Sequence, residues 1–203
     1  NDRPDIIVVG NALNGKSAEA KFILEGDIPY YSMPSFMEEF LLDSKKPVVI
    51  SGTHGKTTTT TIFSELLTGI GADPSYMIGG IPEFSGTNSA FSEGEKYFVI
   101  EGDEYDTAFF DKGPKFLHYK PETTIITSIE FDHADIYDSV DAIFNNFVKL
   151  VGITKKKVIL CLDFEHNRNL TCHIPSEKLF TYSIEDKRAD AFIQFEEREG
   201  SLM

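Results

Sequence analysis

The sequence predicts an α/β fold with a mostly parallel sheet. Short apolar runs alternate along the chain with stretches of helical periodicity, which is typical of βαβ units. A glycine-rich loop stands directly between one apolar run and one helical stretch, which is the context of a P-loop. The chain has 203 residues, 41% of them hydrophobic, which is enough for one core and part of a second domain.

The beginning of the chain predicts one strand and two short helices. The apolar run at residues 6–9 is typical of a buried strand. Residues 17–25 show helical periodicity. Ser35 followed by Glu38 is the pattern of a capping box, so we expect a second helix that begins at this serine.

A domain boundary is expected near residue 46, because Pro47 follows two lysines there and interrupts the pattern. This boundary divides the chain into residues 1–46 and 47–203. In the second unit, apolar runs predict strands at 48–50, 97–100, 124–127 and 157–162. Periodicity predicts helices at 56–67 and 139–151, and the tail has the pattern of β structure at 178–182 and 189–195.

The chain is strongly acidic, with 33 Asp and Glu against 19 Lys and Arg and a formal net charge of −14. Nucleic acids and anionic membrane surfaces both attract basic segments, so neither is expected as a partner. No apolar run in the sequence reaches the length of a membrane span. The two cysteines form no close pair motif, which suggests a reducing compartment.

The strongest chemical signal is the glycine-rich loop after the predicted strand at 48–50. The residues expected to bind nucleotide are Gly52, Thr53, His54, Gly55, Lys56, Thr57 and Thr58. Backbone amides at such a loop cradle phosphates; Lys56 is expected to reach the β- and γ-phosphates of ATP, and Thr57 to bind Mg²⁺. The common motif has glycine where this chain has Ile50, so the loop is a shorter variant. A glycine-rich turn with a solvated lysine is the alternative.

Two acidic segments each follow a predicted strand. Residues 101–106 read EGDEYD, and residues 132–135, which include His133, read DHAD. Ligands in open α/β sheets bind beyond the carboxyl ends of the strands, and Mg²⁺ prefers carboxylate oxygens. A magnesium site is one interpretation of these segments. The other interpretation, in a chain this acidic, is a solvated acidic loop and a surface histidine.

The three motifs together resemble those of the Mur ligase family, the ATP-dependent amino-acid and peptide ligases of bacterial cell-wall synthesis. The run GTHGKTTT at 52–59 is similar to that family's own shortened P-loop, which accounts for Ile50. Residues 104–112, 115–119 and 130–136 resemble one branch of the family. The resemblance covers nearly the whole chain.

This resemblance implies a protein of three domains, of which the chain holds a part. Residues 1–46 resemble the back part of a Rossmann-like, UDP-binding N-terminal domain. Residues 47–203 resemble a truncated central ATP-binding domain of the P-loop type. The C-terminal domain for the amino substrate has no counterpart in the sequence, so the chain alone is expected to be inactive.

The resemblance also implies roles for individual residues. Lys56 resembles the phosphate-binding lysine, and Thr57 and Glu101 resemble ligands of Mg²⁺. His133 resembles the histidine at a second metal, so Lys56 and His133 are the expected catalytic residues. Asn88 resembles an asparagine near the sugar-nucleotide substrate. Ser128 is a departure, since it stands where the family commonly has asparagine.

The implied reaction uses ATP and Mg²⁺ in the bacterial cytoplasm, in peptidoglycan recycling. The lactyl carboxylate of UDP-N-acetylmuramate becomes an acyl phosphate, which the amine of the murein tripeptide L-alanyl-γ-D-glutamyl-meso-diaminopimelate attacks. A sister branch adds L-alanine instead, but Tyr105 and Asp106 favour the tripeptide branch. A GTPase-like switch would need an Asn-Lys-x-Asp motif, which the sequence lacks. A nucleotide-binding fragment without catalysis stays open as an alternative.

Overall fold

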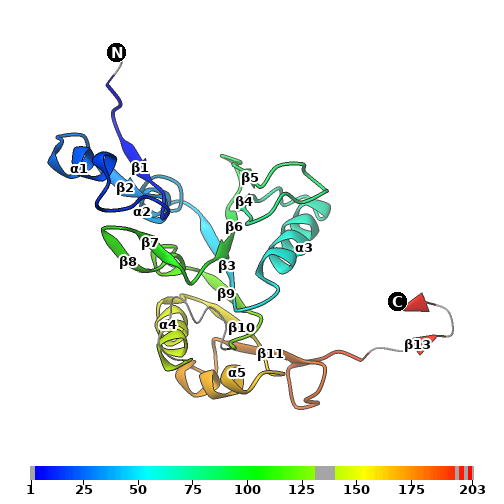
Figure 1. Ribbon diagram of the computed structural model, residues 1–203. Helices are drawn as coiled ribbons and strands as arrows, with labels where there is room; N and C mark the ends of the chain where they lie inside the picture. Colours follow the sequence, from blue (N-terminus) through cyan, green and yellow to red (C-terminus); the bar gives the residue numbers. More distant parts are fainter. Residues whose placement is uncertain (1–2, 131–139, 195–196, 199–200, 203) are drawn as a thin grey trace.

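A computed structural model describes residues 3–130, 140–194, 197–198 and 201–202. Its main feature is an eight-stranded sheet with the strand order β12-β11-β10-β9-β3-β6-β4-β5 (Figure 1). Neighbouring strands in this sheet pair in parallel, except that β5 runs antiparallel to β4. The predicted α/β class with a mostly parallel sheet is confirmed.

The strands of this sheet are short and follow the predicted apolar runs. They are β3 (Lys46–Ser51), β4 (Ser75–Met77), β5 (Ser89–Ala90), β6 (Tyr97–Gly102), β9 (Thr123–Ile126), β10 (Lys157–Cys161), β11 (Leu179–Ser183) and β12 (Ala191–Phe192). The strands predicted at 48–50, 97–100, 124–127 and 157–162 correspond to β3, β6, β9 and β10. Near the end of the chain, β13 (Glu197–Arg198) and β14 (Ser201–Leu202) pair antiparallel as a separate unit.

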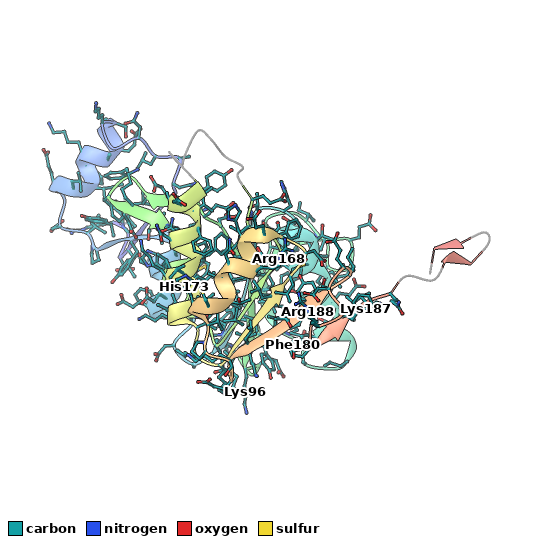
Figure 2. The ribbon with its side chains drawn as sticks, turned by 90° about the horizontal axis from the view of Figure 1, so that it is seen from below. Lys96, Arg168, His173, Phe180, Lys187 and Arg188 are labelled. Atoms are coloured by element: carbon teal, nitrogen blue, oxygen red, sulfur yellow. The ribbon has the colours of Figure 1, made fainter. Side chains whose placement is uncertain are left out.

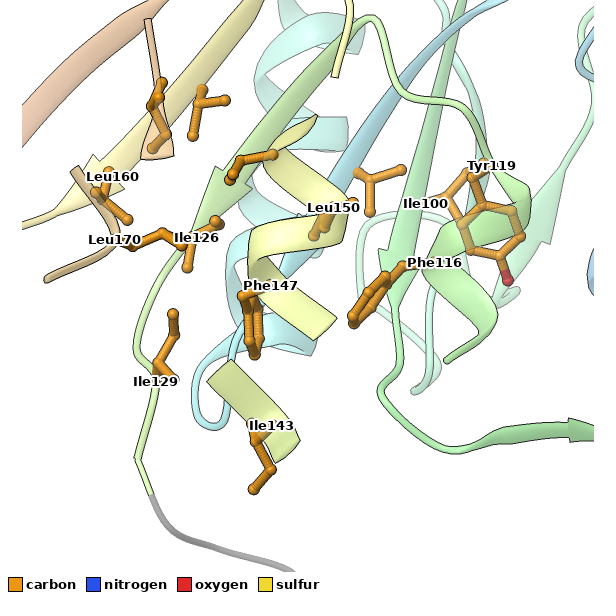
Figure 3. Close-up of a cluster of buried hydrophobic side chains, with 14 of the residues drawn as sticks. Ile100, Phe116, Tyr119, Ile126, Ile129, Ile143, Phe147, Leu150, Leu160 and Leu170 are labelled. Carbon is orange, nitrogen blue, oxygen red and sulfur yellow. The ribbon is translucent and has the colours of Figure 1, made fainter. Parts of the chain in front are cut away.

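Helices cover both faces of the sheet. Successive side chains of a strand point to opposite faces, so the continuous apolar runs of these strands need cover on each face. On one face lie α4 (Val140–Ile153), α5 (Glu165–Leu170) and the 3-10 helices η1 (Lys115–His118) and η2 (Thr171–His173). Figure 3 shows Phe116 of η1 and Phe147 and Leu150 of α4 packed there, all at most 1% exposed. On the other face, Val48 and Ile50 of β3 pack against α3 (Lys56–Gly69).

The first part of the chain adds a small unit of its own. β1 (Ile7–Val9) pairs in parallel with β2 (Tyr30–Ser32), and α1 (Ala18–Glu25) and α2 (Met33–Phe40) accompany them. The hairpin of β7 (Asp106–Ala108) and β8 (Asp111–Pro114) packs against this unit. Ala108 shares a buried cluster with Val9 and Ile23, so the hairpin joins the small unit to the large sheet.

A charged network makes a second connection between these parts. The His118 side chain lies between two carboxylates, with Nδ1 3.2 Å from Glu38 Oε2 and Nε2 3.0 Å from Asp111 Oδ2. Glu38 belongs to α2, whereas Asp111 belongs to β8. Ser32 Oγ also donates to Asp111 Oδ2 at 3.2 Å. Sequence reasoning assigned no role to His118, and its contact with Glu38 joins residues that are 80 positions apart along the chain.

Two local expectations need correction. The helix expected to begin at Ser35 begins earlier, at Met33, and its N-cap is Ser32, whose Oγ accepts from Ser35 N at 3.2 Å. Pro34 lies in the first turn, where its missing N–H costs no helical hydrogen bond. Pro47 does not interrupt the structure, since it is the second residue of β3 and is aligned with Phe98 of β6.

One edge of the eight-stranded sheet is formed by β12, next to β11. Figure 2 labels Arg168 of α5, Phe180 of β11 and Arg188 of the β11–β12 connection at this edge. The edge strand β12 is separated from β3 by β11, β10 and β9. Within the described part of the chain, no helix is long and apolar enough to cross a membrane.

Candidate functional site

The glycine-rich loop lies at the carboxyl end of β3, near the middle of the sheet (Figure 1). Gly52 has a φ of 139°, a conformation that L side chains rarely adopt, and a Cβ there would lie 2.2 Å from Thr127 Oγ1. Gly55 is the N-cap residue of α3. The first N–H groups of a helix lack helical acceptors and bind anions well, so this loop has the geometry of a phosphate site.

The segment after β9 holds the loop in this shape. Thr53 N donates to Ser128 O at 2.7 Å, and His54 N donates to Ser128 Oγ at 3.0 Å. Thr127 Oγ1 donates in turn to His54 O at 2.6 Å. The Ser128 hydroxyl therefore supports the loop backbone.

Lys56, the first residue of α3, is folded back over the loop. Its Nζ donates to Gly52 O at 2.7 Å and lies 3.3 Å from Oε1 and 3.2 Å from Oε2 of Glu104. Both side chains are largely buried, with 11% of Lys56 and 4% of Glu104 exposed. Burial raises the pKa of the Glu104 carboxyl, and the positive charge of Lys56 opposes that rise.

Thr57 and Glu101 meet beside this lysine. Thr57 Oγ1 donates to Glu101 Oε1 at 2.9 Å, and the backbone N–H of Gly79 donates to Glu101 Oε2 at 2.7 Å. The carboxylate therefore has a fixed orientation at the end of β6. A Cβ at position 79 would lie 2.8 Å from Glu101 Oε2, so a larger residue there would displace this carboxylate.

These oxygens fit a magnesium ion. Mg²⁺ prefers oxygen ligands and commonly takes only one or two groups from the protein, with water and substrate phosphates completing its shell. The Thr57 hydroxyl and the Glu101 carboxylate are such a pair, and both lie next to the glycine-rich loop. No cluster of three or more His, Cys, Asp or Glu side chains with metal-binding geometry occurs among the residues that the structure describes.

A cavity of about 350 Å³ adjoins this carboxylate. Gly10 and Asn11 of the small unit line one side, and Gly79, Asn88 and Glu101 line the other. Asn88 also fixes the local backbone, since its carbonyl accepts from Ile78 N at 2.9 Å. The cavity thus extends from the first part of the chain to Glu101, the carboxylate that contacts Thr57.

One cation also faces this cavity. Lys115 of η1 lies 3.0 Å from Asp103 Oδ2, and both residues line the cavity, as does Tyr119. Tyr119 is 1% exposed, and its burial raises the pKa of the phenol strongly. An anionic group that entered this cavity would therefore meet Lys115 beside a carboxylate that already partly neutralises it.

Comparisons with known proteins agree with this geometry. Residues 50–203 match the family model described as the Mur ligase middle domain. The chain belongs to the Mur ligase family. Its residues 50–203 match the middle domain of that family, and the predicted resemblance is confirmed.

The relatives of this Mur ligase chain include two branches. The UDP-N-acetylmuramate–L-alanyl-γ-D-glutamyl-meso-2,6-diaminoheptandioate ligase of Escherichia coli K12 is 42% identical over 151 residues, which cover 74% of this chain and 33% of the relative. The UDP-N-acetylmuramate–L-alanine ligase of Fusobacterium nucleatum is 31% identical over 199 residues, which cover 96% and 40%. The chain therefore spans roughly a third of the first relative's length.

A solved Mur ligase structure has the same fold. The UDP-N-acetylmuramate:L-alanyl-γ-D-glutamyl-meso-diaminopimelate ligase of Neisseria meningitides superimposes with a TM-score of 0.80 at 32% identity. The match covers 88% of this chain and 58% of that one. The fold around the P-loop is thus the fold found in that ligase.

The structure brings several of the expected site residues together. Lys56, Thr57 and Glu101 converge at the ends of β3 and β6, and Asn88 lines the adjoining cavity. His54 is exposed, with Nε2 3.8 Å from Glu130 Oε2, and Thr58 is exposed on α3. His133 lies outside the described residues.

Glu104 is the member of the site that sequence reasoning missed. The sequence placed it in an acidic segment but offered no sign that it would be buried against a residue 48 positions away. A carboxylate three residues after Glu101 was the available signal, since the chain turns back toward the P-loop there.

Proposed function

We propose that this chain is the nucleotide-binding part of an ATP-dependent ligase. The full enzyme would join L-alanyl-γ-D-glutamyl-meso-diaminopimelate to UDP-N-acetylmuramate in peptidoglycan recycling. The observation that carries the proposal is the arrangement of Lys56, Thr57 and Glu101 around the P-loop, beside a cavity that reaches the first part of the chain. ATP and Mg²⁺ are the proposed cofactors.

The residues of the chain would act by positioning and by charge. The loop amides and Lys56 would hold the β- and γ-phosphates of ATP, and Thr57 and Glu101 would hold Mg²⁺. Bound Mg²⁺ would neutralise charge on the phosphates. The lactyl carboxylate of UDP-N-acetylmuramate would attack the γ-phosphate and release ADP. The peptide amine would then displace phosphate from the acyl phosphate and form the amide. His133 is the proposed ligand of a second metal.

The cavity beside Glu101 is the proposed place for the carboxylate-bearing sugar. Asn88 is available there as a hydrogen-bonding side chain, and Lys115 is available as a cation. Residues 1–46 would form part of the UDP-binding domain and residues 47–203 part of the ATP-binding domain. A location in the bacterial cytoplasm is part of the same proposal, as is the absence of nucleic-acid and membrane partners, which the net charge of −14 favours.

The comparisons favour the tripeptide over L-alanine as the proposed amino substrate. The relative that acts on the peptide is 42% identical, whereas the relative that acts on L-alanine is 31% identical. The chain covers 33% and 40% of these relatives, so either activity must be tested with the full-length enzyme.

Calorimetric titration with Mg·ADP and Mg·ATP tests the nucleotide site in the chain itself. Lys56→Ala and Thr57→Ala should each weaken binding at least about tenfold, the factor that corresponds to about 1.4 kcal/mol. Lys112→Ala is the matched control, because Lys112 is an exposed lysine whose Nζ pairs with Asp106 at 2.8 Å. Unchanged affinity in both loop variants would reject the site.

For the reaction, the full-length enzyme is incubated with ATP, Mg²⁺, UDP-N-acetylmuramate and either amino substrate. Mass spectrometry of the product should show faster formation of the UDP-linked tripeptide. Faster ligation of L-alanine would instead assign the chain to the sister branch.

A further inference from the structure

The Glu104 carboxylate is buried against the amine that would bind phosphate. It lies in the segment between β6 and β7, and only 4% of its side chain is exposed. Both of its oxygens are within 3.3 Å of Lys56 Nζ. The pair joins two segments that are 48 residues apart in the sequence.

This contact uses the hydrogen-bonding capacity of Lys56. An ammonium group has three donors. Its contacts in the structure are Gly52 O at 2.7 Å, Thr53 O at 3.4 Å and the Glu104 carboxylate at 3.2 Å. An incoming phosphate must therefore replace at least one of these acceptors or share its donor. Glu104 is the only charged acceptor of these three, so it competes most strongly with a phosphate dianion for the Lys56 amine.

The burial of Glu104 strengthens this competition. A largely buried carboxylate interacts with nearby charges more strongly than an exposed one, because water screens it less. It would attract Lys56 and repel phosphate oxygens that approach the same amine. Other carboxylates of the segment lack this position. Asp106, for example, is 49% exposed and pairs with Lys112.

We propose that Glu104 competes with phosphate for the Lys56 amine and thereby sets nucleotide affinity, because phosphates must take the amine from this carboxylate. The proposal rests on the proposed nucleotide-binding function. Glu104 is a positioning residue here, since it acts through Lys56. In a working ligase this restraint of the amine would weaken the hold on ADP and favour its release after each turnover.

Titration calorimetry with Mg·ADP tests the inference in the 203-residue chain. Glu104→Gln keeps the shape of the side chain and removes its charge, so it should lower the Kd at least about fivefold, the lower end of typical coupling between sites. Asp106→Asn is the matched control. It removes the same charge from a position two residues after Glu104, where Asp106 forms an exposed pair with Lys112. Its Kd should stay within about twofold of the wild type. In a Lys56→Ala background, Glu104→Gln should no longer strengthen binding.

A second measurement needs no nucleotide. Trace acetylation with acetic anhydride, read by mass spectrometry, reports how accessible and reactive the Lys56 amine is. Glu104→Gln should increase the labelling of Lys56 relative to that of Lys112, and Asp106→Asn should leave Lys56 unchanged. If Lys56→Ala fails to fold, this labelling takes the place of the double variant.

The outcomes separate the two proposals. If neither the wild type nor Glu104→Gln binds Mg·ADP, the nucleotide-binding function is rejected, and this inference with it. If the wild type binds and Glu104→Gln binds equally or more weakly, only the restraint is rejected. Equal strengthening by Asp106→Asn would also reject it, because the effect would then be one of general charge. Tighter binding by Glu104→Gln alone, with increased labelling of Lys56, supports it.

Discussion

Gly79→Ala offers a way to disturb the proposed magnesium site with little effect on the fold. The new Cβ would lie 2.8 Å from Glu101 Oε2 and 2.9 Å from Oε1. The lower limit of an ordinary contact is 3.4 Å, so the carboxylate must move by about 0.6 Å. That movement lengthens the 2.7 Å hydrogen bond from Gly79 N, which fixes the orientation of the carboxylate.

The expected magnitude follows from this hydrogen bond. Bonds to a charged group contribute about 1.5–3 kcal/mol, which corresponds to about 10–150-fold in an equilibrium constant. Loss of a group that orients a metal ligand typically costs about 10–100-fold in metal affinity. We therefore expect Mg²⁺ to bind the ADP complex about 10–100-fold more weakly in Gly79→Ala. Stability should change by less than about 1 kcal/mol, because the displaced atoms end a flexible side chain and φ is not positive.

The assay is a calorimetric titration of Mg²⁺ into the chain saturated with ADP, with thermal melting measured in parallel. Gly94→Ala is the matched control, since a Cβ at this position meets no atom within 4 Å. ADP binding without Mg²⁺ should be similar in all three proteins. Unchanged Mg²⁺ affinity in Gly79→Ala would show that Glu101 does not hold the metal through this geometry. A large loss of stability would show that the glycine serves the fold instead.

Two further predictions concern the neighbours of the loop. Ser128→Ala removes the acceptor of the 3.0 Å hydrogen bond from His54 N, so urea unfolding should show a loss of about 1 kcal/mol, and Mg·ADP should bind more weakly; unchanged affinity would mean that the backbone bonds alone hold the loop. The second concerns pH and Glu104, whose pKa is raised by burial in the folded chain. The folded state then binds more protons than the unfolded state as pH falls toward the unfolded value of about 4.3, so the wild type should gain stability relative to Glu104→Gln between pH 8 and pH 5. A difference in melting temperature that is independent of pH would contradict this assignment.

Much of the fold was predictable because its signals are local. The buried strands β3, β6, β9 and β10 follow continuous apolar runs, and the P-loop follows from glycine and lysine spacing. The N-cap of α2 was predicted wrongly because two serines compete there, and the proline between them was given no weight. Short strands such as β2 and β5 were missed, since three or two residues of mixed polarity carry no periodicity.

The site was predictable only in part, for a different reason. Lys56, Thr57 and Glu101 lie within motifs whose residues carry their own signal. Glu104 contacts Lys56, which is 48 residues away, and His118 contacts Glu38, which is 80 residues away; no local pattern encodes such contacts. Composition gave no signal for Glu104 either, because one carboxylate does not stand out in a chain with 33 acidic residues.

Strand order explains why the charges of this site are balanced as they are. β3, which leads into the P-loop, lies between β9 and β6. The segment after β9 gives the loop neutral support through Ser128, whereas β6 and the residues after it bring the carboxylates Glu101 and Glu104. One carboxylate faces the Thr57 hydroxyl and the other faces the Lys56 amine, three residues apart on the same segment. A parallel sheet delivers both from the carboxyl end of a single strand, so the proposed magnesium ligand and the proposed restraint on the amine have the same structural origin.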